Sequence, residues 1–268
     1  MHRAFLDRPV LITVDGQSNM VGHLGIGGSR IENPLVFCYE LFPTGDGQTT
    51  GWKSDGMNGP HYPFSATGNS IFYHVADIVQ RATGRAVCVI CHAVGGMPIR
   101  EWWDISKTGN ARIGVLYSRL YNSLQYALDL PLPGRPDGKT LRQLGITAAD
   151  VHLRHQGESD ADYVGGSFAG YRQSLLEIVA AYRAPSTLGI PLHPMIRPSA
   201  PFICGELLIG GTSPSTGSPT DDRNDALRDL AEIGAIRLAP ADGLTAVDTI
   251  HFDGPSLVEL ARRYAALF

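Results

Sequence analysis

Short apolar runs alternate along the chain with longer segments in which apolar residues recur every three or four positions. The runs cover residues 10–14, 35–39, 86–91, 150–153 and 202–208. Runs that are apolar throughout are typical of parallel strands covered on both faces. The periodic segments cover residues 69–82, 113–128, 168–182, 223–233 and 255–267, and they predict helices. Strands separated by helices predict an α/β fold with a five-stranded, mainly parallel sheet between two layers of helices.

Composition narrows the organisation and the partners of the chain. No charged linker, composition change or internal repeat divides the 268 residues, so we predict one domain over residues 1–268. An apolar share of 43% is enough for a large core. A net charge of −4 disfavours nucleic acid as a partner, because phosphate binding needs clustered Lys and Arg. The composition leaves the oligomeric state open.

Membrane and secretion signals are not evident in the sequence. No apolar run approaches the roughly 20 residues needed to cross a bilayer, so we expect no membrane partner. The apolar run at residues 10–14 is too short for a signal peptide, and no small-residue cleavage site follows it. We therefore expect a cytoplasmic protein, unless a leader has been trimmed from the sequence.

The cysteines and histidines do not have the spacing of a metal site. Cys88 and Cys91 form a C-x-x-C pair, but a spacing of three on a strand points two side chains to opposite faces. No second pair completes a zinc site, so we predict buried free thiols at Cys38, Cys88, Cys91 and Cys204. The same spacing predicts that one of His152 and His155 packs in the core and the other lies near the site. We expect no metal and no cofactor.

Glycine and proline are concentrated where function is expected. The chain has 31 glycines and 18 prolines, and they cluster in residues 16–28, 43–63, 95–96, 131–138 and 185–219. Most of these segments follow an apolar run. In open α/β sheets ligands bind beyond the carboxyl ends of the strands, so we expect the functional residues in these segments.

The first of these loops holds a serine. In Asp15-Gly16-Gln17-Ser18-Asn19, Gly16 allows a tight turn at the end of the first predicted strand. Ser18 would then project above the sheet with its backbone N–H free, as one donor of an oxyanion hole. Taken alone, a serine beside a glycine is more often a plain turn residue.

An acid and a histidine precede the last predicted helix. In Asp248-x-x-His251, one turn of chain can place the carboxylate on one ring nitrogen and leave the other to take a proton from a serine. Alone, this pattern is more often a turn that begins with Asp and carries a surface histidine. The order serine, acid, base at predicted loop positions favours the catalytic interpretation.

Two further loops can supply hydrogen-bond donors. The pair Gly95-Gly96 lets the backbone approach a ligand and direct the Gly96 N–H at it. Gln156 offers a side-chain amide after the fourth predicted strand. Together with the Ser18 N–H these groups would make a three-donor oxyanion hole, in which each donor lowers the barrier by about 3–4 kcal/mol.

These four blocks, in this order, resemble the SGNH hydrolase superfamily, and within it the carbohydrate-esterase branch of acetylxylan esterases and sialate O-acetylesterases. They are Gly16-Gln17-Ser18-Asn19, Gly95-Gly96, Gln156-Gly157-Glu158 and Asp248-x-x-His251. The resemblance extends from residue 14 to residue 254. It implies a flavodoxin-like three-layer α/β/α sandwich and a serine esterase without a cofactor. The wider superfamily has Asp before the serine and Asn as the third donor; Gln at both positions is typical of the carbohydrate-esterase branch.

The resemblance also implies roles for individual residues. Ser18 would be the nucleophile, His251 the general base and Asp248 the acid that orients it, with Gly96 and Gln156 as oxyanion donors beside Ser18.

Several neighbouring residues have weaker assignments. Trp102 and Trp103 would either stack on a sugar ring or cover the sheet edge. Glu158 would brace the nucleophile loop by accepting backbone N–H groups, and Asp15 would cap the turn. Asn19 would hold the turn or contact substrate, and Gly95 would let the backbone come close.

The resulting prediction is a carbohydrate O-acetylesterase acting on a small-molecule or oligosaccharide acetyl ester. One alternative is a short-chain aryl or lipid esterase or a thioesterase; another is a non-catalytic carbohydrate-binding protein. Long acyl chains need a deep apolar tunnel, whereas the loops are rich in Gly, Ser, Thr and Asp. The sequence does not specify the sugar, and we expect segments 43–63 and 185–219 to shape that choice.

Overall fold

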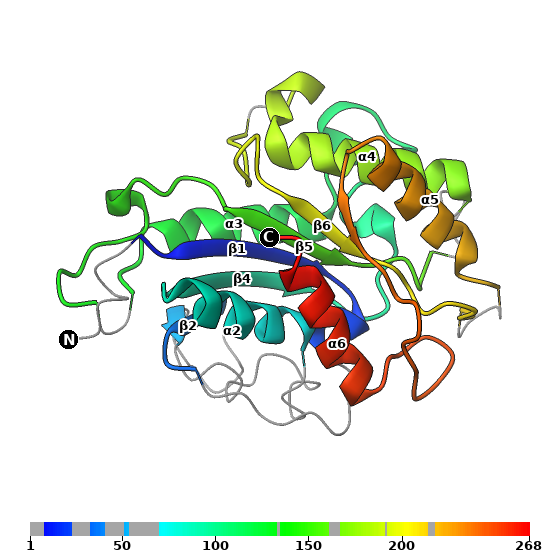
Figure 1. Ribbon diagram of the computed structural model, residues 1–268. Helices are drawn as coiled ribbons and strands as arrows, with labels where there is room; N and C mark the ends of the chain where they lie inside the picture. The colour runs from blue at the N-terminus through cyan, green and yellow to red at the C-terminus, as the bar shows by residue number, and fades with distance from the viewer. Residues whose placement is uncertain are drawn as a thin grey trace, which may run out of the picture.

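A seven-stranded sheet forms the centre of the molecule (Figure 1). The computed structural model describes residues 8–22, 33–40, 51–53, 70–132, 135–160, 167–190, 192–213 and 218–268. The strand order is β3-β2-β4-β1-β5-β6-β7, and only the β2–β3 pair is antiparallel. The strands are β1 (Val10–Gly16), β2 (Val36–Glu40), β3 (Gly51–Lys53), β4 (Val87–Ala93), β5 (Val151–His155), β6 (Phe202–Gly205) and β7 (Arg237–Ala239).

All five apolar runs form strands, namely β1, β2, β4, β5 and β6, so the prediction of an α/β fold with a mainly parallel sheet is confirmed. The predicted number of five strands is wrong. The two additional strands, β3 and β7, are three residues long and lie at the edges of the sheet. Strands this short contain no apolar run, so the sequence pattern does not reveal them.

The strand order places the candidate residues. Numbered along the chain without β2 and β3, the strands β4-β1-β5-β6-β7 have the flavodoxin order 2-1-3-4-5, and β2 and β3 extend the edge beside β4. The order reverses at β1, which lies between β4 and β5. Gly16 and His155 are register partners, so β1 and β5 end side by side. The segments that follow these two strands therefore meet at the switch point, where open α/β sheets bind ligands.

The five predicted helices are present and cover both faces of the sheet. They are α2 (Ile71–Thr83), α3 (Val115–Leu128), α4 (Phe168–Arg183), α5 (Asp221–Glu232) and α6 (Gly254–Ala265). In Figure 1, α2 and α6 lie on one face of the sheet and α3, α4 and α5 on the other. The three-layer sandwich is thus confirmed. No helix among the described residues is long and apolar enough to cross a membrane.

The helix ends follow from local sequence. Helix α2 ends at Thr83 because Gly84 adopts a left-handed φ of 66° and donates its N–H to the Gln80 carbonyl. Helix α6 begins after Asp253, whose carboxylate accepts the Ser256 N–H, and a proline lies in its first turn.

Two apolar clusters, one on each face of the sheet, make up the core. Successive residues of β1 alternate between them: Leu11 packs with helices α3, α4 and α5, and Ile12 packs with α2 and α6. Cys88 and Cys91 also belong to opposite faces, as predicted. All four cysteines are free, and all but the half-buried Cys91 are buried. Burial raises the pKa of the Cys91 thiol to about 12, so this thiol is protonated at neutral pH.

Gly16 cannot be replaced without displacing β5. It has a φ of 138°, and a Cβ atom at this position would lie 2.2 Å from the His155 carbonyl oxygen. The Gln17 N–H donates to that same oxygen at 2.9 Å. We expect Gly16→Ala to lower the free energy of unfolding by about 3 kcal/mol or more, through backbone strain and overpacking of about 1–3 kcal/mol each. Urea denaturation measures this loss.

Gly84 provides the matched control for Gly16. It also has a positive φ, 66°, but no atom lies within 4 Å of an added Cβ. Gly84→Ala should therefore cost only the strain of the left-handed backbone, about 1–2 kcal/mol. Similar small losses for the two variants would contradict the steric argument.

Candidate active site

Ser18 lies directly beyond the end of β1. It is the first residue of the short helix α1 (Ser18–Val21), which ends where Gly22 adopts a φ of 83° and donates its N–H to the Ser18 carbonyl at 2.9 Å. Before it, the Gln17 N–H is bonded to the end of β5. The turn is thus held at both ends. The Ser18 side chain is largely buried, and its Oγ lies 2.8 Å from His251 Nε2.

Asp248 and His251 form the single turn that their spacing predicts. Asp248 Oδ2 lies 2.7 Å from His251 Nδ1, while Oδ1 accepts the N–H groups of Ile250 at 2.9 Å and of His251 at 2.7 Å. Burial by itself would raise the pKa of the Asp248 carboxyl, but these hydrogen bonds outweigh it and the pKa lies below its ordinary value. A carboxylate only accepts hydrogen bonds, so Nδ1 carries the imidazole proton and Nε2 can accept from the Ser18 hydroxyl.

The structure therefore joins Ser18, His251 and Asp248 in one hydrogen-bonded series, although they come from opposite ends of the sequence. A histidine held in this way can take the hydroxyl proton as the serine oxygen attacks a carbonyl carbon. The arrangement is suited to acyl transfer.

Two backbone N–H groups beside Ser18 are unpaired. A Cβ atom on Gly95 would lie 3.8 Å from Ser18 Cβ, so the loop after β4 is next to the serine. Gly96 adopts a left-handed φ of 73°, which favours glycine. Within the described part of the chain, neither the Ser18 N–H nor the Gly96 N–H donates a hydrogen bond. Both can donate to an oxygen bound beside the serine.

Gln156 lies beside the same loop, but its amide is already engaged. Its nitrogen donates to the Met97 carbonyl at 3.2 Å and to the Asp160 carboxylate, and its oxygen accepts from Arg154 at 3.3 Å. The third donor was expected to be free, but its nitrogen is paired in this structure with the Met97 carbonyl and the Asp160 carboxylate. Its role as an oxyanion donor remains a prediction.

Glu158 and Asn19 connect the loops of the site. Glu158 is fully buried and accepts the side-chain amides of Gln17 at 2.6 Å and Asn19 at 2.8 Å. It therefore braces the Ser18 loop as predicted, but through side-chain amides and not through the backbone N–H groups that were expected. Asn19 also donates to the Ile250 carbonyl at 2.9 Å and accepts the Phe252 N–H at 3.1 Å. Asn19 thus holds the nucleophile turn against both sides of the histidine segment, and the sequence could not choose this role over substrate contact.

The two histidines of β5 are divided as predicted. His152 packs against the rings of Tyr182 and Phe202 in the core, and the His155 Nε2 lies 3.5 Å from Glu158 beneath the site. Burial lowers the pKa of both histidines, which keeps them neutral. Among the described residues, no group of three or more His, Cys, Asp and Glu side chains could hold a metal ion.

The stacking role predicted for the tryptophans is wrong. Trp102 and Trp103 are 0% and 1% exposed, so neither presents a face to a sugar. The 3-10 turn η3 (Ile99–Glu101) directs the chain into the core at this point. The Trp102 ring lies 4.8 Å beneath the Arg154 guanidinium, and Trp103 Nε1 donates to Glu177 at 2.6 Å. Adjacent tryptophans in a sequence do not reveal which side of a turn they occupy.

A buried ion pair lies below the site and was missed by the sequence analysis. The prediction that Asp15 caps the turn is wrong. Its carboxylate accepts hydrogen bonds from Arg154 Nη1 at 2.7 Å and from the Tyr182 hydroxyl at 2.6 Å, and the side chains of Asp15 and Arg154 are both buried. Burial alone would raise the pKa of Asp15, but Arg154 and the hydrogen bonds hold it below its ordinary value. An arginine directly after the apolar run at residues 150–153 was the available signal.

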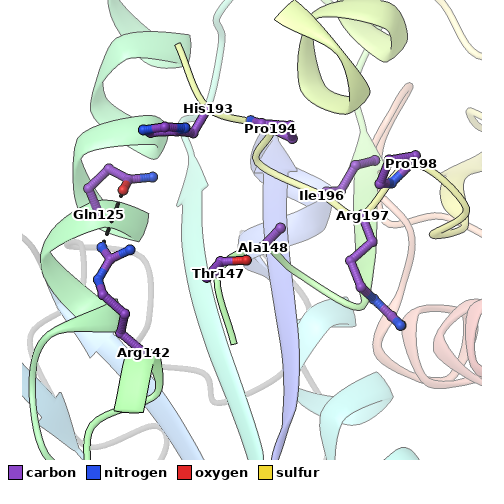
Figure 2. A pocket seen from close by; sticks show the side chains of 9 residues that line it. All are labelled: Gln125, Arg142, Thr147, Ala148, His193, Pro194, Ile196, Arg197 and Pro198. Carbon is purple, nitrogen blue, oxygen red and sulfur yellow. Dashed lines mark hydrogen bonds between the residues drawn. The ribbon is translucent and has the colours of Figure 1, made fainter. Parts of the chain in front are cut away.

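A separate hollow of about 400 Å³ lies at the opposite end of the sheet (Figure 2). Its lining includes Gln125, Arg142, Thr147, His193 and Arg197, and residues 147 and 197 precede the amino ends of β5 and β6. None of its described lining residues is a serine, Asp or Glu, so these residues do not supply the groups of a serine esterase. Part of segment 185–219 therefore lies away from Ser18. Segment 43–63, apart from β3, lies outside the described residues.

Comparisons with known proteins identify a family that matches most of the chain. Residues 58–268 match the family described as carbohydrate esterase, sialic acid-specific acetylesterase. No curated protein sequence matches the chain significantly.

Several solved structures share the fold. One is a protein from Arabidopsis thaliana, with 19% identity and a TM-score of 0.64, covering 96% of this chain and 97% of that one. NanS has 14% identity and a TM-score of 0.62, covering 97% and 96%. XAC1771, a carbohydrate acetylesterase from Xanthomonas citri, has 15% identity and a TM-score of 0.58, covering 96% and 54%.

Proposed function

Since the chain belongs to the carbohydrate esterase family described as sialic acid-specific acetylesterase, we propose that it removes O-acetyl groups from sugars with Ser18 as the nucleophile. The observation that carries the proposal is the hydrogen-bonded series from Ser18 Oγ to His251, at 2.8 Å, and from His251 to Asp248, at 2.7 Å. Family membership supports the ester-hydrolase chemistry, and the geometry supports the assignment of the residues.

Acylation begins when His251 Nε2 takes the Ser18 hydroxyl proton. The serine oxygen forms a bond to the acetyl carbonyl carbon, and the carbonyl π electrons move to its oxygen. This oxyanion accepts the unpaired N–H groups of Ser18 and Gly96. The tetrahedral intermediate then collapses: the bond to the sugar oxygen breaks, and His251 gives its proton to that oxygen. The products of this half-reaction are the deacetylated sugar and acetyl-Ser18.

Deacylation repeats these steps with water. His251 takes a proton from the water as its oxygen attacks the acetyl carbon, and the second oxyanion occupies the same donors. Collapse breaks the bond to Ser18 Oγ, which recovers its proton from His251. Acetate leaves, and the enzyme returns to its starting state without a cofactor.

The fixed backbone dipoles suit a neutral ester. A neutral acetyl group carries no charge for an ionic clamp, so the site needs donors aimed at the developing oxyanion. The substrate that fits the family and the polar loops is a small-molecule or oligosaccharide acetyl ester. A short-chain aryl or lipid esterase, or a thioesterase, would use the same residues with a different acyl or alcohol pocket.

Acyl-chain length and the alcohol component test the proposal together. We expect kcat/KM for p-nitrophenyl acetate to exceed that for the octanoate ester by about tenfold or more, roughly 1.4 kcal/mol or more of discrimination. Acetate release is then measured on O-acetylated sialic acids, acetylated xylo-oligosaccharides and cephalosporin-type acetyl esters. A preference for octanoate would favour the lipid-esterase alternative.

Covalent labelling separates an esterase from a carbohydrate-binding protein. An organophosphate should add to Ser18 in a one-to-one ratio, read by intact mass and peptide mapping. Absence of labelling, together with absence of acetate release from every ester, would refute the esterase proposal.

A further inference from the structure

The side-chain amide of Gln156 lies between two buried groups of opposite charge. On its oxygen side, Arg154 Nη2 donates at 3.3 Å; on its nitrogen side, the Asp160 carboxylate accepts. All three side chains are buried. A guanidinium group only donates hydrogen bonds and a carboxylate only accepts them, so each neighbour suits one end of the amide.

This arrangement permits one orientation of the amide. A half-turn about the last side-chain bond would set the amide N–H groups against the guanidinium and the oxygen against the carboxylate. Two charged groups would then be buried against the wrong partner, which is strongly unfavourable. A glutamine between neutral neighbours would not be restricted in this way.

Each of the two charged groups is itself held in place. Arg154 donates to Asp15 at 2.7 Å and lies over the Trp102 ring. Asp160 accepts the Ile99 N–H at 2.8 Å, which ties it to the segment that follows Gly96. The amide is thus held between β5 and the loop after β4.

The fixed orientation directs the second amide hydrogen of Gln156 to the Met97 carbonyl, at 3.2 Å. Met97 follows Gly96, whose unpaired N–H is one of the two proposed oxyanion donors. A substrate oxygen that approached the Gly96 N–H could replace the Met97 carbonyl as acceptor of this hydrogen, while the bond to Asp160 stays intact.

We propose that Arg154 and Asp160 are positioning residues that hold the Gln156 amide with its nitrogen toward the oxyanion. This proposal rests on the proposed esterase function. Neither side chain contacts the reacting atoms. They act by presenting a dipole that is already oriented before the transition state forms, which is the condition under which such a donor is most effective. The positive charge beside the amide oxygen also polarises the N–H groups.

A double-mutant cycle on Gln156 and Asp160 tests this role. Gln156→Ala should lower kcat by about 10²–10³-fold, the usual effect of removing one oxyanion donor. In Asp160→Asn the new amide keeps the Ile99 N–H bond but turns its own N–H groups toward Gln156, which favours the wrong orientation. We expect kcat to fall by about tenfold or more, with KM changed by less than about threefold. Because Asp160 acts through Gln156, the double variant should be no slower than Gln156→Ala.

Controls separate positioning from stability. Asp77→Asn changes another buried carboxylate, which lies in α2 and accepts hydrogen bonds from Asn33 and Arg81. We expect this variant to keep the wild-type kcat even where its thermal stability is similar to that of Asp160→Asn. If Asp160→Asn does not fold, Arg154→Lys replaces it in the cycle, since one ammonium group pairs with Asp15 but does not reach Gln156 as well.

The outcomes are distinct. A wild-type kcat in the Asp160 variant, or an equal loss with and without Gln156, would overturn the positioning role. Equal inactivity of the wild type and of Ser18→Ala toward every ester would instead refute the proposed function.

Discussion

Replacement of Ser18 by alanine is expected to lower kcat for acetate release by about 10⁴–10⁶-fold. The variant lacks the oxygen that forms the acyl-enzyme, and only the oxyanion donors and bound water remain. The free energy of unfolding should change by less than about 1.5 kcal/mol, because only one hydrogen bond, to His251 Nε2 at 2.8 Å, is lost. Initial rates with p-nitrophenyl acetate and urea denaturation give the two quantities.

The matched control for this substitution is Ser106→Ala. Ser106 lies in an exposed turn, where its hydroxyl donates to Asp104 at 2.6 Å. It should retain wild-type kcat and bind an organophosphate at Ser18, whereas Ser18→Ala should bind none. Activity above a few per cent in Ser18→Ala, with no wild-type protein present, would remove Ser18 as the nucleophile.

Asp248→Asn is expected to lower kcat by about 10⁴-fold while the turn stays folded. Asparagine Oδ1 can still accept the N–H groups of Ile250 and His251 that Asp248 accepts. Its amide nitrogen, however, would donate to His251 Nδ1, so the imidazole proton would move to Nε2. That nitrogen would then face the Ser18 hydroxyl as a donor and could not take its proton. The effect follows from the tautomer and not from the loss of the loop.

Asp253→Asn is the control for Asp248→Asn, because it changes a carboxylate of the same loop whose hydrogen bonds are to Thr245 and Ser256. Asp253 caps α6 by accepting the Ser256 N–H at 2.8 Å, and asparagine caps helices about as well. We expect its kcat to stay within about twofold of wild type. If the two variants lose activity equally, the orienting role of Asp248 is wrong.

The strands and helices with long apolar patterns could be predicted from the sequence, since each buries a face that the pattern displays. The apolar run at residues 86–91 forms β4. Helix α2 ends at Thr83, because the next residue, Gly84, adopts the left-handed conformation. Strands β3 and β7 could not be predicted, because three residues at a sheet edge carry too little pattern.

The three residues of the hydrogen-bonded series were the easier part of the candidate site to predict. Ser18 follows the first predicted strand, and Asp248 and His251 precede the last predicted helix, which is a specific order of motifs. The three-residue spacing also places Asp248 and His251 in one turn. The supporting residues were harder. Asp15, Glu158 and the tryptophans each have several possible partners, and their partners lie more than 70 positions away in the sequence for most of these contacts.

The sequence by itself thus determined the α/β class, the loops that follow the strands, and Ser18, Asp248 and His251 as the candidate residues, because these depend on local pattern and order. Only the tertiary structure decided that the tryptophans are buried, that Asn19 joins the serine turn to the histidine segment, and that Gln156 is held between Arg154 and Asp160. The physical reason is that a polar group removed from water must find a hydrogen-bond partner, and the fold determines which distant group is within reach.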